Sequence, residues 1–70
     1  MSKLHFYEKS SKVADGDGTL NNAGFDAKIT WGSVEKGHTY EVKQGQKPSG
    51  DSYPCIAGGT KNDTAKFGPK

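Results

Sequence analysis

The sequence predicts a small all-β protein. We expect an antiparallel sheet, as a sandwich or partly open barrel of about four to six short strands with long Gly-, Asn- and Asp-rich loops. Apolar residues at helical spacing are nowhere sustained over the length of a helix, and ten Gly and three Pro interrupt the chain as often as short strands require. The clearest segment, residues 25–31, alternates apolar and polar side chains without exception.

The length of the chain limits its core. A chain of 70 residues forms one domain at most, and it buries a smaller fraction of its surface than a longer chain does. Only 30% of the residues are apolar, but three Phe, three Tyr and one Trp increase the area that can be buried. We predict a single β domain over residues 1–57, followed by a loosely ordered segment, 58–70, whose docking point would be Phe67.

The first predicted strand covers residues 4–8. Its alternation places Leu4 and Phe6 on one face and His5 and Tyr7 on the other. Since Leu4 and Phe6 belong in the core, His5 and Tyr7 are candidates for an exposed contact patch.

Residues 13–26, "VADGDGTLNNAGFD", are predicted to form a long turn between strands. Three Gly, three Asp and two Asn lie in this stretch, and these residues tolerate left-handed backbone and form Asx turns. The central "DGDG" resembles part of an EF-hand loop, but Val13 and Gly24 then fall at the first and twelfth positions, where side-chain oxygens are needed. We therefore predict no metal site. The weak alternative is a looser calcium site built from Asp15, Asp17 and Asn21.

Residues 25–44 are predicted to form a β-hairpin. The apolar face of its first strand would consist of Phe25, Ala27, Ile29 and Trp31, all directed into the core. A turn follows in which Gly37 would adopt a positive φ, and the returning strand would direct Tyr40 and Val42 inward. After a loop, residues 53–57 are predicted to be a short edge strand, because Pro54 has no N–H to donate to a neighbour.

The charges predict a solvated surface. The ten basic residues are all Lys, the formal net charge is +2, and the lysines are spread along the chain. Arg provides the planar fork that grips phosphates and guanine edges, so its absence argues against nucleic acid as the partner. No apolar run is long enough to predict a membrane span.

Cys55 is the one cysteine, so no internal disulfide can form. The lack of a disulfide indicates a reducing compartment, and the chain as written is predicted to be cytoplasmic. Secretion is the alternative if Met1 replaces a removed signal peptide. No spacing brings Cys55 together with His5 or His38, and a lone cysteine beside apolar neighbours is typically buried. No cofactor motif is complete, since the glycine-rich stretches match neither the dinucleotide fingerprint nor the phosphate loop.

These observations predict a non-enzymatic binding protein, because so small a core leaves little scaffold to support a catalytic pocket. The expected partner is another protein, bound as an inhibitor, modulator or effector would bind it, with pairing through an edge strand that would also permit homo-oligomers. The candidate contact residues are His5, Tyr7, Tyr40 and Lys43. The alternative is a lectin-like protein that binds carbohydrate, with or without calcium, through Trp31 and Tyr53.

Overall fold

The computed structural model describes residues 2–70, and strands are its only regular elements. The prediction of a small all-β protein is confirmed. The strands in chain order are β1 (Ser2–Glu8), β2 (Ser11–Gly18), β3 (Phe25–Val34), β4 (Thr39–Gln44), β5 (Asp51–Ala57), β6 (Gly59–Thr60) and β7 (Thr64–Phe67).

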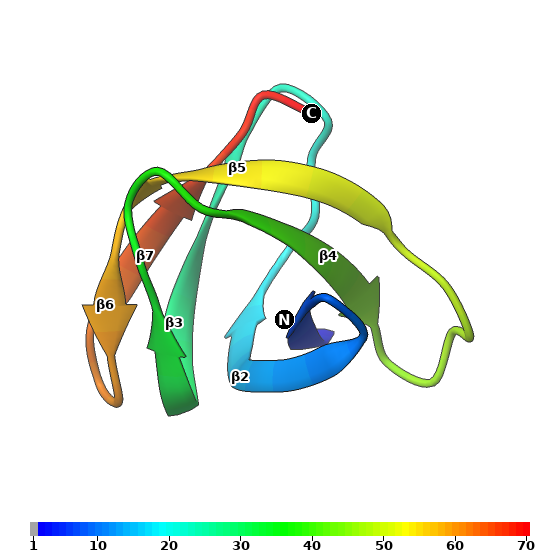
Figure 1. Cartoon of the computed structure of the whole chain (residues 1–70), viewed down its shortest axis with the longest axis horizontal. Helices are drawn as coiled ribbons and strands as arrows, with labels where there is room; N and C mark the ends of the chain where they lie inside the picture. Colours follow the sequence, from blue (N-terminus) through cyan, green and yellow to red (C-terminus); the bar gives the residue numbers. More distant parts are fainter. Residues whose placement is uncertain (1) are drawn as a thin grey trace.

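Six of the strands close into an antiparallel barrel (Figure 1). The order is β2-β1-β4-β5-β7-β3, and β2 pairs with β3 to complete the ring. The short β6 pairs only with Ser33 and Val34 at the end of β3. Every barrel strand therefore has two neighbours. Among residues 2–70, the predicted pairing of a partner or a second copy with an edge strand has only the free side of the two-residue β6 to use.

One apolar cluster fills the barrel. Its centre is Phe67, whose ring stacks on Phe6 with centroids 4.8 Å apart and on Phe25 with centroids 5.2 Å apart. The predicted inward residues of the first strand and of the strand at 39–44 are indeed buried. The whole cluster is Leu4, Phe6, Ala14, Phe25, Ala27, Ile29, Val34, Tyr40, Val42, Tyr53, Cys55, Ala65 and Phe67.

Trp31 lies outside this cluster, contrary to the prediction. Asp15 of β2 is opposite Trp31 and Gly16 is opposite Ile29, so Thr30 has no partner on β2 and forms a β-bulge. An extra residue in one strand reverses the alternation beyond it. The prediction that the apolar side chains of this strand point into the core is therefore correct before the bulge. It is wrong for Trp31, which is 53% exposed.

Residues 13–18 belong to a strand and are not part of a turn, which corrects the prediction for 13–26. Gly16 and Gly18 point into the barrel where β2 and β3 approach closely: a Cβ at Gly16 would lie 2.8 Å from the carbonyl oxygen of Lys28. These glycines are needed for close backbone approach, and only residues 19–24 form the connection.

The predicted hairpin over 25–44 is also wrong, because β3 and β4 do not pair with each other. β4 lies between β1 and β5, whereas β3 lies between β2 and β7. Residues 35–38 lead from one side of the barrel to the other, and Gly37 in this turn has φ of +92°, as expected. Two strands that are adjacent in sequence thus face each other across the barrel.

β5 is an interior strand of the wall and not an edge strand, although it contains Pro54. The carbonyl oxygen of Pro54 accepts a hydrogen bond from the N–H of Gly68, so the backbone of Pro54 faces the β7 side. The N–H and C=O of one residue in a strand point to the same side, so the missing N–H removes no bond to β4.

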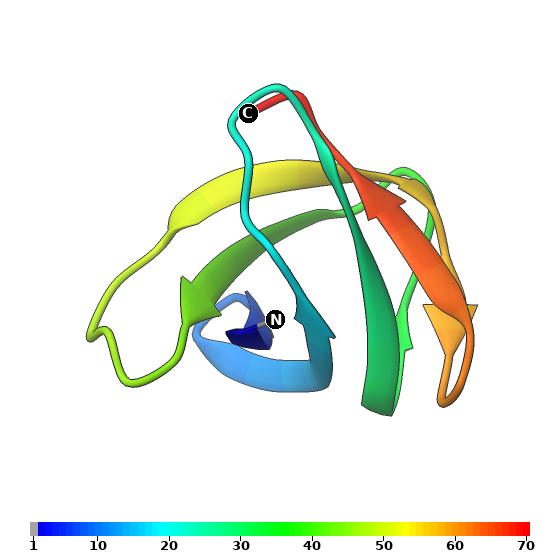
Figure 2. The ribbon, with the colours of Figure 1, turned by 180° about the vertical axis from the view of Figure 1, so that it is seen from behind.

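Residues 58–70 complete the barrel and are not a loose segment. β7 lies between β5 and β3, and the side chains of Ala65 and Phe67 are buried in the barrel. The composition of residues 58–70 did not indicate β7, because this strand is held in place by hydrogen bonds to its neighbours β5 and β3. Figures 1 and 2 show the C-terminus beside the 19–24 connection, where the N–H of Lys70 donates to the carbonyl oxygen of Asn22.

Candidate contact surface

Two of the predicted contact residues, Tyr40 and Tyr53, are inside the barrel, each with 2% of its surface exposed. The hydroxyl of Tyr40 accepts a hydrogen bond from the N–H of Glu35, and burial raises the pKa of Tyr40. The hydroxyl of Tyr53 donates to Oδ1 of Asn22. Neither ring is available to a partner, which removes Tyr40 from the predicted protein contact and Tyr53 from the predicted glycan contact.

The three residues of the alternative calcium site do not form one cluster. Asp15 and Asp17 point outward from β2, whereas Asn21 lies in the 19–24 connection, where its Oδ1 accepts a hydrogen bond from the N–H of Ala23. Within residues 2–70, no group of three or more His, Cys, Asp and Glu side chains is placed to hold a metal ion. The predicted calcium alternative therefore has no carboxylate cluster in the part of the chain that the structure describes.

Cys55 is buried, and burial raises the pKa of its thiol. Its Sγ donates to the carbonyl oxygen of Ala57 at 3.4 Å. The histidine rings are directed elsewhere, since His5 contacts Asp15 and His38 contacts Glu8. The described residues also enclose no pocket. Chemistry at this thiol would need a base and a substrate cavity, and the geometry around Cys55 supplies neither.

His5, Asp15 and Lys12 form a charged network on the outside of β1 and β2. The carboxylate of Asp15 lies 2.6 Å from Nδ1 of His5 and 3.2 Å from Nζ of Lys12. Partial burial by itself would raise the pKa of Asp15, but the hydrogen bonds from His5 and Lys12 outweigh it and lower the pKa. Asp15 therefore stays ionised and fixes both basic side chains.

Lys43 and Tyr7 form a second contact beside this network. Nζ of Lys43 lies 4.3 Å from the centroid of the Tyr7 ring, which is a cation–π geometry. Lys43 of β4 is directly opposite His5 of β1. Three of the four residues predicted to contact a protein partner, His5, Tyr7 and Lys43, thus share one outer face.

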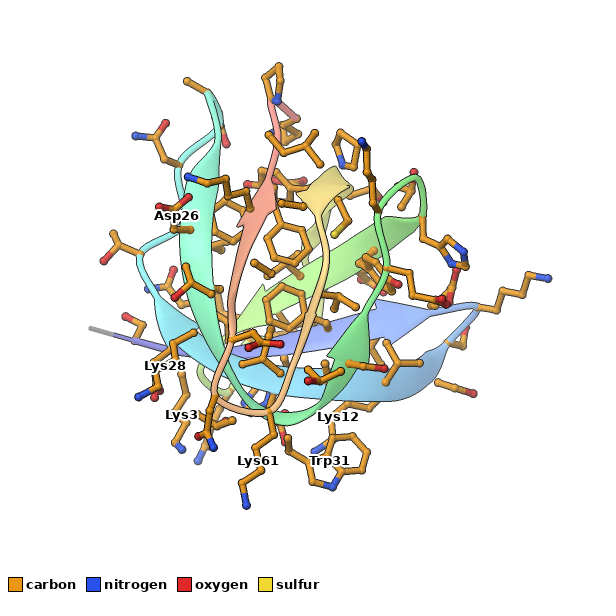
Figure 3. All side chains as sticks on the ribbon, turned by 90° about the vertical axis from the view of Figure 1, so that its left-hand side faces the viewer. Lys3, Lys12, Asp26, Lys28, Trp31 and Lys61 are labelled. Atoms are coloured by element: carbon orange, nitrogen blue, oxygen red, sulfur yellow. The ribbon has the colours of Figure 1, made fainter. Side chains whose placement is uncertain are left out.

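The largest exposed aromatic group lies farther along the same surface. Nζ of Lys12 is 5.4 Å from the centroid of the Trp31 ring. Lys3 of β1 and Lys28 of β3 flank Asp17 of β2, each directly opposite it. Figure 3 shows Lys3, Lys12, Lys28 and Trp31 together with Lys61 along one border of the barrel, pointing outward. We call Lys3, Lys12, Lys28, Trp31 and Lys61 the Trp31 patch.

Lys61 reaches the patch from the turn between β6 and β7. The next residue, Asn62, donates its N–H to the carbonyl oxygen of Ile29 at 2.7 Å, and the N–H of Ile29 donates to the carbonyl oxygen of Asp63. This turn is therefore tied to β3 two residues before Trp31. Asn62 adopts a positive φ of 79° in the turn, a conformation that Asn tolerates better than most residues.

The Trp31 patch carries an excess of positive charge. Among residues 2–70, no ion pair engages Lys3, Lys28 or Lys61, and Lys12 shares the carboxylate of Asp15 with His5. Three further carboxylates lie near these lysines. Asp17 is between Lys3 and Lys28 without a close contact to either ammonium group, Asp26 pairs with Lys66, and Asp63 accepts hydrogen bonds from Thr60. An exposed indole that shares its surface with three lysines that make no ion pair among the described residues is suited to an anionic partner.

This patch could not be predicted from the sequence, for two reasons. Its lysines are far apart in the chain and are brought together only by the pairing of β1, β2 and β3 and by the β6–β7 turn. The bulge at Thr30 then turns Trp31 outward beside them. The alternation of apolar and polar residues did indicate that Lys28 points outward. It indicated neither the bulge at Thr30 nor the order of the strands.

Comparison with protein-family models, curated proteins and solved structures finds no match to this chain. Residues 2–70 contain no helix that is long and apolar enough to cross a membrane.

Proposed function

We propose that this protein is a non-enzymatic binding protein that holds an anionic macromolecule against the Trp31 patch. The observation that carries the proposal is the indole of Trp31, which is 53% exposed on a surface where Lys3, Lys28 and Lys61 have no ion-pair partner among the described residues.

The position of Trp31 is unusual for so small a protein. A Trp can bury roughly 150 to 250 Å² of surface, and a short chain needs such area for its core. Here the bulge at Thr30 directs that area to the solvent, while the barrel is filled by smaller rings such as Phe67. An exposed aromatic group that the core does not use is available for a contact.

The lysines around Trp31 supply attraction and orientation. Uncompensated ammonium groups on one side of a molecule create a field that speeds the encounter with an oppositely charged partner. The closed barrel holds β1, β2 and β3 in a fixed register, so the charges are arranged before binding. The described residues have no pocket, so recognition would take place on this outer surface.

The residues predicted from sequence extend this surface. Asp15 contacts both His5 and Lys12, and Lys12 lies over Trp31, so the network connects the patch to Tyr7 on β1 and Lys43 on β4. A macromolecule that covers Trp31 would therefore also reach His5. A protein with an acidic surface, in line with the expected protein partner, is one occupant of this kind.

An amide proton–nitrogen correlation spectrum tests the proposal. The chain would be labelled with ¹⁵N and titrated with heparin, used only as a generic polyanion, at low salt. We expect shifts concentrated at the Trp31 indole N–H and at the amides of residues 3, 12 and 28, and weaker shifts in Lys28→Ala. The matched control is Lys36→Ala, since Lys36 is exposed in the turn between β3 and β4. Shifts spread evenly over all lysines, or none at Trp31, would refute the proposed surface.

A further inference from the structure

We infer that the anionic macromolecule is a single-stranded nucleic acid, which stacks a base on Trp31 and places its phosphates against Lys3, Lys12, Lys28 and Lys61. This inference rests on the proposed function and names the partner class of the same surface. It is carried by the combination of one exposed aromatic ring with four nearby ammonium groups, of which those of Lys3, Lys28 and Lys61 have no ion-pair partner among residues 2–70.

Single-stranded nucleic acids are recognised by this combination. Proteins that bind them without reading sequence use aromatic rings on which bases stack and basic side chains that follow the backbone. In the Trp31 patch, Lys12 lies on one side of the indole, and Lys28 is three positions away along β3, about 10 Å at the rise of a strand. If a single-stranded nucleic acid stacks a base on Trp31, its backbone would therefore pass Lys12 on one side of the indole and Lys28 on the other.

The surroundings of Trp31 favour a nucleic acid over an acidic protein. The centre of a protein–protein interface is depleted in charged residues and rich in apolar ones. Around Trp31 the opposite holds, because its nearest neighbours are charged: Nζ of Lys12 lies 5.4 Å from the ring centroid, and Asp15 is directly opposite Trp31 on β2. The other large apolar side chain that is exposed in the described chain, Ile56, lies on β5, and β7 separates that strand from β3. A single indole among lysines suits stacked bases and phosphates better than an apolar protein surface.

The absence of Arg restricts the mode of binding without excluding the partner. Arg reads guanine edges through two parallel hydrogen bonds, whereas Lys acts on a phosphate as a point charge. The absence of Arg and the dispersion of the lysines along the chain argued against nucleic acid, but folding brings Lys3, Lys12, Lys28 and Lys61 onto the same surface as Trp31. We therefore expect binding that tolerates many sequences. Single strands are favoured over duplexes, since bases inside a duplex are already stacked on each other.

Fluorescence titration provides the direct test, because Trp31 is the one Trp of the chain. The probe is an oligothymidylate of about ten nucleotides, within the range of lengths that single-strand sites cover. We expect it to quench the emission of Trp31 at low salt. The logarithm of the binding constant should fall with the logarithm of the salt concentration with a slope of about −3, if all four lysines neutralise phosphates.

Variants separate stacking from charge. With a dye-labelled oligothymidylate followed by anisotropy, Trp31→Ala should weaken binding about tenfold or more, and Trp31→Phe should recover part of the loss. Lys28→Ala should make the salt slope less steep by about 0.7, whereas Lys36→Ala should leave it unchanged. All three side chains are exposed, and a thermal melt by circular dichroism confirms that each variant is folded before its affinity is compared.

The outcomes distinguish the inference from the proposed function. If poly-L-glutamate binds at the Trp31 patch and oligothymidylate does not, the nucleic-acid inference is overturned and the anion-binding function stands. If neither polymer nor heparin binds there, both are overturned. A DNA duplex that binds as tightly as the single strand, or an affinity for oligothymidylate that does not change in Trp31→Ala, also overturns the inference.

Discussion

Phe6 of β1 and Phe67 of β7 stack on each other inside the barrel, with their ring centroids 4.8 Å apart, although their strands do not pair. Phe67 also stacks on Phe25 and meets the ring of Tyr40 edge-on. A residue near the C-terminal end of the sequence therefore joins side chains from three other strands of the barrel.

We expect Phe67→Ala to lower the free energy of unfolding by about 3 to 5 kcal/mol, because it leaves a cavity at the centre of the aromatic cluster. Urea denaturation followed by far-ultraviolet circular dichroism would measure the change. The matched control is Lys66→Ala, an exposed neighbour on β7, which should shift the free energy of unfolding by no more than about 0.5 kcal/mol. Equal effects of the two substitutions would contradict the central role of Phe67.

Gly16→Ala should be destabilising by about 1 to 3 kcal/mol, since the added Cβ would lie 2.8 Å from the carbonyl oxygen of Lys28 and 3.3 Å from a ring carbon of Phe6. The same denaturation experiment measures it. Thr19→Ala, at an exposed position in the connection after β2, is the comparison. A tolerated Ala at position 16 would mean that β2 and β3 are not as close as described.

The Cys55 thiol should react slowly with iodoacetamide at neutral pH in the folded protein. The side chain is buried, and burial raises its pKa, so little thiolate is present or reachable. Mass spectrometry of timed samples gives the rate, and unfolding in urea should accelerate it strongly. Rapid modification of the native protein would instead indicate an accessible, activated thiol.

Asp15 should contribute to stability at neutral pH and lose this contribution in acid. Its pKa is lowered in the folded state, because the hydrogen bonds from His5 and Lys12 outweigh the opposing effect of burial. Stabilisation by such a carboxylate is fully present above its unfolded pKa of about 4 and disappears as the pH falls through the lower folded value. We therefore expect Asp15→Asn to be less stable than the wild type by about 1 kcal/mol at pH 7.

Thermal melts of the wild type and Asp15→Asn between neutral and strongly acidic pH would show the difference narrowing below about pH 4. Asp17→Asn is the control on the same face of β2, because no hydrogen bond or ion pair to the Asp17 carboxylate occurs among the described residues. A gap between wild type and Asp15→Asn that is independent of pH would show that the charge of Asp15 is not responsible.

The sequence predicted the fold class and much of the core, because large apolar residues at alternate positions allow few interpretations. Leu4 and Phe6 lie inside as expected, as do Ile29 and Val42. Strands without large apolar residues were not recognised. β2 presents Ala14, Gly16 and Gly18 to the interior, and small side chains of this kind are equally typical of a turn.

The long-range pairing was harder to predict than the alternation. Nothing local distinguishes a β3–β4 hairpin from the observed turn that crosses to the other side of the barrel, since Gly37 with a positive φ suits both. The candidate site depends on the same information. His5, Tyr7 and Lys43 follow from the alternation and the β1–β4 pairing, whereas the exposure of Trp31 depends on one unpaired residue, Thr30.

The division between the two sides of the barrel wall has a practical consequence. The inward side chains form the apolar core that stabilises the fold. The outward positions on β1, β2 and β3 are occupied by residues such as Lys3, Lys12 and Lys28, which are not part of the core. Combinatorial libraries can therefore randomise those outward positions while every inward residue is retained. The molecule thus offers a cysteine-poor, disulfide-free framework on which new binding specificities can be selected.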